Sequence, residues 1–316
     1  MEFYRGRRVL VLGGTGFLGS NLCARLVESG AMVTATGTRA RAAGAEASIR
    51  AVRWEAPDRE ALRPLVRDAD VVFSVFGRSG AVRSIQEPLA DLEVNGAGQL
   101  VVLETVRRER PDAKVVFAGS RLQFGRINDL PARESDAMEP LDVYGIHKLT
   151  AEHYHRVYHR VYGLRTTVLR LTNPYGPGQA ADGRGYGFVN GMVQRALTGE
   201  PLTIFGEGRQ LRDLVYIDDA MGAFLSVGAT ETTDGEVYNV GGGVGIPLLE
   251  IARAIVRGVG AGRVEHAPWP AVAQAIETGD FVADVSKIAK AVDWRPRVAA
   301  DDGLARTIAA YRGARA

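Results

Sequence analysis

Short apolar runs alternate with amphipathic segments along the first half of the chain. The apolar runs predict strands at 9–14, 32–36, 52–56, 70–77 and 113–120. The segments between them carry apolar residues at helical spacing and predict helices over 20–30, 57–69 and 89–110. Apolar strands that alternate with helices are typical of a parallel sheet covered by helices on both faces. The predicted fold class is therefore α/β, with a Rossmann-type doubly wound parallel sheet.

The second half of the chain has a less regular pattern. A sixth strand is predicted within 166–178, where it runs into a loop, and a helix is predicted over 186–200. We expect residues 1–172 to form a first domain, which contains this sheet. Residues 173–316 are expected to form mainly a smaller C-terminal substrate-binding cap, with some segments returning to the sheet. Because ligands of open parallel sheets bind at the carboxyl ends of the strands, the cap is expected to cover that edge.

Composition and charge narrow the class of protein. The 316 residues carry a net charge of +2, which is too small to indicate a nucleic-acid partner. The lone cysteine, Cys23, excludes an internal disulfide framework and fits a reducing compartment. No apolar run approaches the roughly 20 residues of a membrane span, and none resembles a signal peptide. A cytoplasmic protein without nucleic-acid or membrane partners is expected.

Three glycines follow the first strand at the spacing of a dinucleotide-binding loop. Gly13, Gly16 and Gly19 form G-x-x-G-x-x-G, and Phe17 and Leu18 belong to the same loop. Such a site needs a tight turn, a close approach of backbone to a pyrophosphate, and the N–H groups of a helix N-terminus. The loop therefore predicts NAD or NADP as the cofactor.

The end of the second strand bears on the choice between these two cofactors. NAD sites commonly hold an acid there, which accepts from the ribose hydroxyls and repels a 2′-phosphate, but here the residue is Gly37. Arg39, with Arg41 close by, has the charge to pair with that phosphate, so the residues favour NADP. The alternative is that Arg39 and Arg41 belong to a solvated loop and do not contact the cofactor. Glu55, after the third strand, either accepts from the adenine amino group or is a solvated carboxylate.

A tyrosine and a lysine stand four residues apart in YGIHK. If the segment is helical, Tyr144 and Lys148 lie on one face. A lysine ammonium near a phenol favours the phenolate, so Tyr144 is expected to remove a proton from a sugar hydroxyl while hydride leaves the same carbon. Ser120, at the end of the fifth strand, is placed to hydrogen-bond the reacting oxygen. These three residues are the predicted catalytic group.

With these motifs in place, the chain resembles the extended short-chain dehydrogenases/reductases of the nucleotide-sugar epimerase/dehydratase family, of the UDP-glucose 4-epimerase type. The likeness extends from about residue 7 to about 312. It rests on VLVLGGTGFLGS, DLEVNGAG, VVFAGSRLQFG, YGIHK, LRLTNPYGPG, PLTIFGEGRQLRDLVYIDD and DWRPRV. The resemblance implies the catalytic roles given above and places Asn95 on the active-site face beside the cofactor. It further implies that Asn173 and Arg212 hold the diphosphate of a nucleotide sugar and that Phe205 belongs to a segment lining its base.

The chain departs from the family in the residues around its substrate. Members that dehydrate the sugar carry an Asp-Glu pair after the catalytic serine or threonine, but here Arg121 and Leu122 stand there, which argues against a 4,6-dehydratase. Arg121 is expected either to reach the substrate or to turn into an ion pair. Several relatives also carry an arginine before the late Gly-Asp pair, and IETGD (276–280) has none. Arg212 alone is then left to hold the diphosphate. Alternatively, Arg212 forms an ordinary ion pair with Asp213 or Glu207.

The segment after the lysine is rich in histidine. Glu152, His155 and His159 have the spacing of one helical face, but no thiol or further carboxylate cluster completes a site, so no metal is expected. In the family this helix commonly packs in a dimer interface. The resemblance therefore implies a homodimer, with helices paired around Tyr154, Val157, Tyr158 and Val161.

Three functions are compatible with these residues. The favoured one is a nucleotide-sugar epimerase, acting at carbon 4 by transient oxidation to a keto sugar and return of hydride through bound NAD(P). The second is an NADPH-dependent ketoreductase of a 4-keto-(deoxy)sugar nucleotide, which Gly37 and Arg39 favour. The third is a non-catalytic NAD(P)-sensing protein, against which the intact Ser120, Tyr144 and Lys148 argue.

Overall fold

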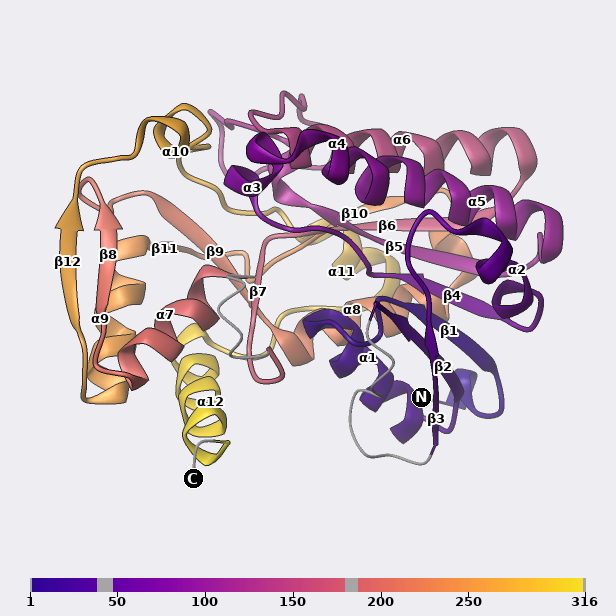
Figure 1. The fold of residues 1–316 in the computed structure, drawn as a ribbon, viewed down its shortest axis with the longest axis horizontal. Coiled ribbons are helices and arrows are strands. Elements are labelled where there is room, and N and C mark those ends of the chain that lie inside the picture. Colours follow the sequence, from indigo (N-terminus) through magenta and orange to yellow (C-terminus); the bar gives the residue numbers. More distant parts are fainter. Residues whose placement is uncertain (1, 39–47, 180–186, 315–316) are drawn as a thin grey trace.

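The computed structural model describes residues 2–38, 48–179 and 187–314, and seven parallel strands form its central sheet (Figure 1). From one edge to the other the strands are β10 (Val237–Val240), β6 (Arg165–Leu171), β5 (Lys114–Ser120), β4 (Val71–Ser74), β1 (Arg8–Leu12), β2 (Met32–Gly37) and β3 (Ile49–Arg53). The order reverses between β1 and β4, which is the arrangement of a doubly wound sheet. The predicted Rossmann-type fold is confirmed.

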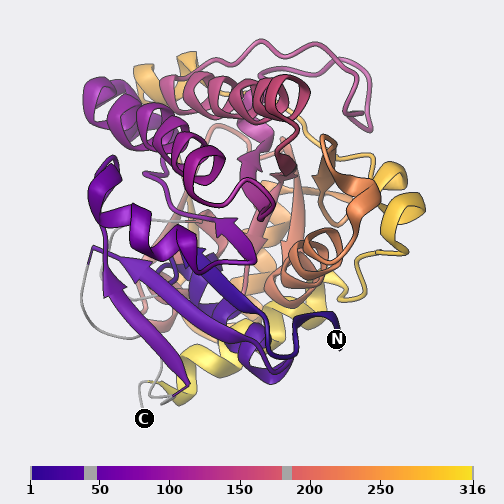
Figure 2. The ribbon, with the colours of Figure 1, turned by 90° about the vertical axis from the view of Figure 1, so that its right-hand side faces the viewer.

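Helices cover both faces of this sheet (Figures 1 and 2). Val9 and Val11 of β1 face one apolar cluster, whereas Leu10 and Leu12 face the other, as the alternation of a strand requires. The first cluster packs against α1 (Phe17–Glu28) and α8 (Ile217–Gly228). The second packs against α2 (Arg59–Arg67), α5 (Gly98–Glu109) and α6 (Val143–Tyr162).

Several predicted boundaries differ from those of the structure. The third strand ends at Arg53 and not at 56, because Trp54 turns away and donates its indole N–H to the Asp58 carbonyl oxygen at 2.7 Å. The helix predicted over 89–110 is divided into α4 (Pro88–Asp91), a π-helical turn at Leu92–Ala97 (η2) and α5. The short helix α3 (Ala81–Gln86) was not predicted.

Residues after 172 contribute to three further regions. A three-stranded sheet contains β11 (Gly245–Pro247), β9 (Leu211–Tyr216) and β7 (Asn173–Tyr175). Beyond it lie a two-stranded sheet and its helices, which are β8 (Pro201–Phe205), β12 (Arg263–Ala267), α7 (Phe188–Leu197), α9 (Leu248–Val259), α10 (Ala271–Ala275) and α12 (Ala300–Gly313). The strand β10, with α8 and α11 (Ser286–Val292), returns to the central sheet. The exact division into domains at 172 stays a prediction.

Short 3-10 turns complete the described chain at Glu2–Tyr4 (η1), Arg121–Gln123 (η3) and Glu231–Thr233 (η4). Among the described residues, none of the helices has both the length and the apolar character needed to span a membrane.

A buried ion pair ties β6 to α6 behind the carboxyl edge of the sheet. The Arg170 guanidinium donates to both Glu152 carboxylate oxygens, at 2.8 and 2.6 Å, and both side chains are almost fully buried. The Gln123 amide donates to the same carboxylate at 2.7 Å. The removal of one partner would leave the other charge buried without compensation.

We predict that Arg170→Met lowers the free energy of unfolding by about 3–5 kcal/mol, the usual cost of breaking a buried pair. The matched control is Arg253→Met, because Arg253 forms an exposed pair with Glu250 and its loss should cost less than about 1 kcal/mol. Urea denaturation measures both. Similar losses in the two variants would contradict this assignment.

Candidate active site

The glycine loop brings backbone close to backbone at the carboxyl end of β1. Gly13 has φ +87°, and a Cβ atom there would lie 2.7 Å from the Phe76 backbone nitrogen. A Cβ atom on Gly19 would lie 2.6 Å from the Cα atom of Gly14, so Gly19 lets α1 pack directly on the loop. Helix α1 begins immediately after Gly16, and its first N–H groups therefore face the loop.

A cavity of about 660 Å3 opens at this edge. Its wall contains most of the predicted cofactor residues, namely Gly13, Gly16, Phe17, Leu18, Glu55 and Lys148. Glu55 is exposed at its rim. The predicted catalytic Ser120 and Tyr144 line the same cavity, as do Arg121 and Asn173 from the substrate group. The fold thus brings the glycine loop and the predicted catalytic residues to one space.

Gly37 ends β2 against the glycine loop. A Cβ atom at this position would lie 2.7 Å from the Cγ2 atom of Thr15, and it would approach the Thr15 hydroxyl even more closely. A glycine at position 37 is therefore required for steric as well as electrostatic reasons. Sequence reasoning did not find the steric reason. Arg39 and Arg41 lie outside the described residues, so the preference for NADP that rests on them stays a prediction.

The catalytic group is assembled by the end of β5 and the first turns of α6. The Asp142 side chain accepts from the Gly145 N–H at 2.8 Å and caps α6, which then presents Tyr144 and Lys148 on successive turns. The Lys148 ammonium donates to the Ala118 carbonyl oxygen at 2.9 Å. The Ser120 hydroxyl accepts from the Leu122 N–H at 3.2 Å and lies close enough to Tyr144 to favour a lower pKa of its phenol.

Burial controls the protonation of this group. It raises the pKa of the Tyr144 phenol above its ordinary value, and the Ser120 hydrogen bond acts in the opposite direction. Burial lowers the pKa of Lys148 to about 8, against the charge of Asp91. The expectation that Lys148 lowers the tyrosine pKa is not met by the protein alone. The ammonium is bonded to Ala118 and lies 5.7 Å from the centre of the Tyr144 ring.

A buried acid–imidazole pair beside the catalytic group was missed by sequence reasoning. The His147 Nδ1 atom lies 2.7 Å from a carboxylate oxygen of Asp91, and Asp91 is 2% exposed. His147 stands within YGIHK and Asp91 within DLEVNGAG, but neither motif indicates that the two side chains meet. Their contact fixes α4 against α6 next to Lys148.

Asn95 lies behind the wall of the cavity and supports it. Its amide donates to the Arg78 carbonyl oxygen at 2.8 Å, and its oxygen accepts from the Arg78 N–H at 3.1 Å. Gly77 and Arg78 line the cavity, whereas Asn95 is fully buried behind them. The predicted direct contact of Asn95 with the cofactor stays a prediction, and its observed contacts fix the loop after β4.

The predicted substrate residues come from three separate segments. Asn173 donates its amide to the Asp213 carbonyl oxygen at 2.8 Å, and the Phe205 ring packs 5.5 Å from the ring of Trp269. Arg212 pairs with Glu277 at 2.6 Å and donates to the Gly279 carbonyl oxygen at 2.7 Å. The alternative named for Arg212 therefore had the wrong partners. An ion pair exists, but its acid is distant in sequence.

The two acids named in that alternative have other roles. Asp213 is fully buried, and its carboxylate accepts from the backbone N–H groups of Gly242, Gly243 and Ala283. Burial raises the pKa of Asp213 to about 6. Glu207 pairs with exposed Arg209 at 2.8 Å. Neither carboxylate is left to hold Arg212.

His155 and His159 of α6 pack within the protein. His155 stacks on Phe117 at 4.8 Å between ring centres, His159 bonds through Nδ1 to the Leu164 carbonyl oxygen, and Glu152 is held by Arg170. Within the described ranges, no group of three or more His, Cys, Asp or Glu side chains has the arrangement of a metal site.

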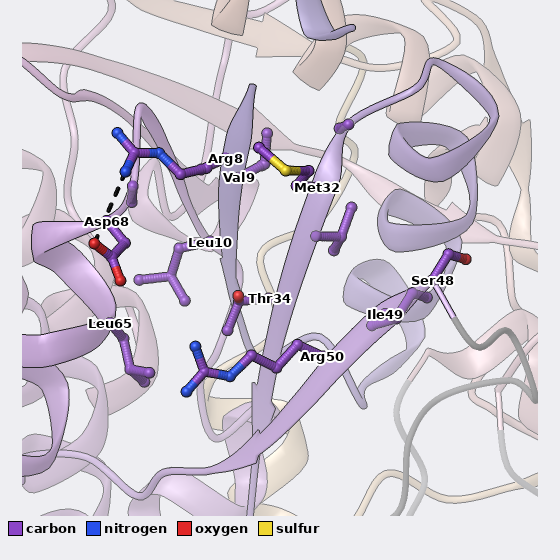
Figure 3. Close-up of a pocket in the computed structure, with 13 residues that line it drawn as sticks. Arg8, Val9, Leu10, Met32, Thr34, Ser48, Ile49, Arg50, Leu65 and Asp68 are labelled. Atoms are coloured by element: carbon purple, nitrogen blue, oxygen red, sulfur yellow. Dashed lines mark ion pairs between the residues drawn. The ribbon is translucent and has the colours of Figure 1, made fainter. Parts of the chain in front are cut away.

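A second cavity, of about 630 Å3, lies at the amino ends of β1, β2 and β3 (Figure 3). Its rim carries the Arg8–Asp68 ion pair, with 3.8 Å between the charged atoms, and its wall contains Leu10, Thr34 and Arg50. Ligands of doubly wound sheets bind at the opposite edge, where the glycine loop and Tyr144 lie. We therefore place the active site in the first cavity.

We predict that Gly37→Asp weakens NAD(H) and NADP(H) binding alike by about tenfold or more, because overpacking against Thr15 costs about 1–3 kcal/mol and displaces the glycine loop. The double variant Thr15→Gly/Gly37→Asp should recover NAD(H) binding. Titration calorimetry measures each affinity, and Gly313→Asp is the control because nothing lies within 4 Å of a Cβ atom there. Unchanged affinities in Gly37→Asp would disprove the steric account.

Comparison with known proteins places this site in context. The model of the "NAD dependent epimerase/dehydratase family" matches residues 9–241. The chain is 30% identical to the low-salt glycan biosynthesis protein Agl12 of Haloferax volcanii, over 96% of this chain and 98% of that protein. Proteins named dTDP-glucose 4,6-dehydratases match as well.

Solved structures agree over the whole chain. The UDP-glucose 4-epimerase of Thermotoga maritima, solved with UDP-glucose, superposes with a TM-score of 0.89 at 28% identity and covers 98% of this chain and 100% of that one. The UDP-glucose 4-epimerase of Thermus thermophilus, solved with NAD, has a TM-score of 0.88 at 30% identity and covers 97% and 99%. The similarity thus extends through both the central sheet and the segments beyond it.

Proposed function

Because the chain belongs to the NAD-dependent epimerase/dehydratase family, we propose that it is a nucleotide-sugar epimerase acting at carbon 4. The observation that carries this proposal is the meeting of Ser120, Tyr144 and Lys148 in the cavity bounded by the glycine loop. The bound NAD(P) of the family supplies a hydride acceptor that can return the hydride to the same carbon. An epimerase needs no net oxidant, which suits a retained cofactor.

Each catalytic side chain has one part in this reaction. The Tyr144 oxygen takes the proton from the sugar hydroxyl as the carbon is oxidised, and it gives the proton back on reduction. Ser120, which lies beside Tyr144 at the end of β5, holds the reacting oxygen in line with it. Lys148, with its pKa lowered to about 8, places its ammonium 5.7 Å from the centre of the Tyr144 ring, and together with the charge of a bound nicotinamide it would favour the phenolate form.

The residues of the cavity fit a dinucleotide. The loop from Gly13 to Gly16 and the start of α1 give backbone N–H groups for a pyrophosphate. Glu55 lines the cavity after β3, which supports its role as an acceptor for the adenine amino group. Gly37 leaves the end of β2 without an acid, which supports the second candidate, an NADPH-dependent ketoreductase of a 4-keto-(deoxy)sugar nucleotide.

The two remaining alternatives have weaker support. A 4,6-dehydratase needs an acid and a base after the catalytic serine, and Arg121 and Leu122 offer neither. A non-catalytic NAD(P) sensor has no need of Ser120 beside Tyr144 or of a buried Lys148. Epimerase and ketoreductase share the same proton-transfer group and differ in the fate of the cofactor.

We also infer a homodimer formed through α6, in a cytoplasmic protein. Val157, Val161 and Tyr162 of α6 are 39%, 58% and 50% exposed, an unusual density of apolar surface on one helix. Tyr158, which the sequence placed in the same interface, is 8% exposed and donates its hydroxyl to Glu104 of α5. Tyr158 therefore joins the two helices within one chain and does not contribute to the inferred interface.

We predict that Tyr144→Phe abolishes turnover, by at least about 10²-fold, because it removes the proton acceptor and leaves the ring in place. The conversion of UDP- and dTDP-linked hexoses is followed by NMR. Tyr162→Phe is the control and should have no effect, since this tyrosine lies at the far end of the same helix and the change keeps the ring that the inferred interface would use. Thermal unfolding should be the same for all three proteins. Activity that survives in Tyr144→Phe would exclude both the epimerase and the ketoreductase.

A further inference from the structure

The charge of Arg212 is matched within the protein. One of its terminal nitrogens donates to the Leu211 and Gly279 carbonyl oxygens, at 3.1 and 2.7 Å, and the other donates to Glu277 at 2.6 Å. The Arg212 side chain is 8% exposed. An arginine held by a carboxylate and two carbonyl groups contributes little net positive charge to a substrate pocket.

Arg121 differs from Arg212 in this respect. It donates one guanidinium nitrogen to the Thr278 hydroxyl at 2.9 Å and lies 5.6 Å from the centre of the Phe281 ring. Within the part of the chain that the structure describes, no carboxylate lies within ion-pair distance of Arg121. Burial, and next the positive charge of Arg212, lower the pKa of Arg121 to about 10, against the opposing charges of Glu277, Asp142 and Asp213. A nearby anion would relieve both effects.

The other arginines of the cavity wall have acidic partners. Arg78 and Arg83 both contact the Glu87 carboxylate. Arg121 lines the same cavity directly after Ser120. Thr278 uses one of the five N–H donors of the guanidinium, so donors remain for a ligand. This guanidinium, which forms no ion pair in the described structure, thus lies one residue from the proton-transfer group.

We propose that Arg121 binds an acidic substituent, a carboxylate, on the sugar ring next to the reacting carbon. This proposal rests on the proposed function, and it names the substrate class as acidic nucleotide sugars of the uronic-acid type. In a hexose the ring separates the reacting carbon 4 from the diphosphate at carbon 1. Carbon 6, in contrast, is attached to carbon 5, which is bonded directly to carbon 4. A carboxylate at carbon 6 therefore lies on the side of Ser120, and the planar fork of Arg121 matches it.

Matched pairs of ligands that differ only at carbon 6 test this proposal. UDP-glucose and UDP-glucuronic acid, and the corresponding dTDP sugars, are titrated calorimetrically into the wild-type protein and Arg121→Gln. Turnover is followed by NMR. We expect the wild-type protein to bind the acidic sugar at least tenfold more tightly than the neutral one. Arg121→Gln should lose this preference through weaker binding of the acidic sugar, with the neutral sugar changed less than twofold.

Two further variants serve as controls for this test. Arg209→Gln removes an arginine that is 84% exposed and paired with Glu207, and it should leave both affinities unchanged. Arg121→Lys keeps the charge without the fork and should recover part of the preference for the acidic sugar. Thermal unfolding of each variant shows whether the fold is retained, and Arg121→Lys provides the test if Arg121→Gln does not fold.

The outcomes separate this proposal from the proposed function. Equal weakening of acidic and neutral sugars in Arg121→Gln would mean that Arg121 holds the diphosphate, which overturns the substrate class and leaves the epimerase intact. A wild-type protein that prefers neutral sugars would also overturn it. Binding and turnover of none of these nucleotide sugars would reject the proposed function, and the proposal would fail with it.

Discussion

The hydrogen bond from the Lys148 ammonium to the Ala118 carbonyl oxygen is the contact on which the arrangement of the active site depends. It joins α6 to the carboxyl end of β5, and it places Tyr144, one turn earlier, beside Ser120, the last residue of that strand. A buried ammonium is costly in free energy unless it is hydrogen-bonded and close to negative charge. Ala118 meets the first need and the charge of Asp91 the second. Burial lowers the pKa of Lys148 to about 8, and the charge of Asp91 opposes this shift.

The two sides of the cavity are built by different physical means. On the cofactor side the residues are determined by steric space, since Gly13, Gly19 and Gly37 lie where a Cβ atom would meet backbone or the Thr15 side chain. On the substrate side the important property of the residues is their charge. Arg212 is paired with Glu277, whereas Arg121 is an arginine of the cavity wall that forms no ion pair in the described structure. In the proposed function the first side holds a dinucleotide, and in our further inference the second selects among substrates by charge.

Sequence reasoning succeeded where the signal is local. Alternating apolar runs predicted the sheet, and the glycine spacing and YGIHK predicted two walls of one cavity, because each motif is contained within a turn or two of chain. It failed where partners are far apart in sequence. The Asp91–His147 pair, the Arg212–Glu277 pair and the packing of Thr15 against Gly37 each join separate elements, and no spacing within one segment indicates them.

One measurement tests the central claim, that the protein moves a hydride out and back without net redox. The protein is purified without added cofactor and denatured, the polypeptide is removed, and the released nucleotide is identified by mass and absorbance. The account predicts near-stoichiometric NAD(H) or NADP(H), because an epimerase reuses the same cofactor in every cycle. An empty site, or NADP that washes away on dilution, would contradict the account and place the ketoreductase first.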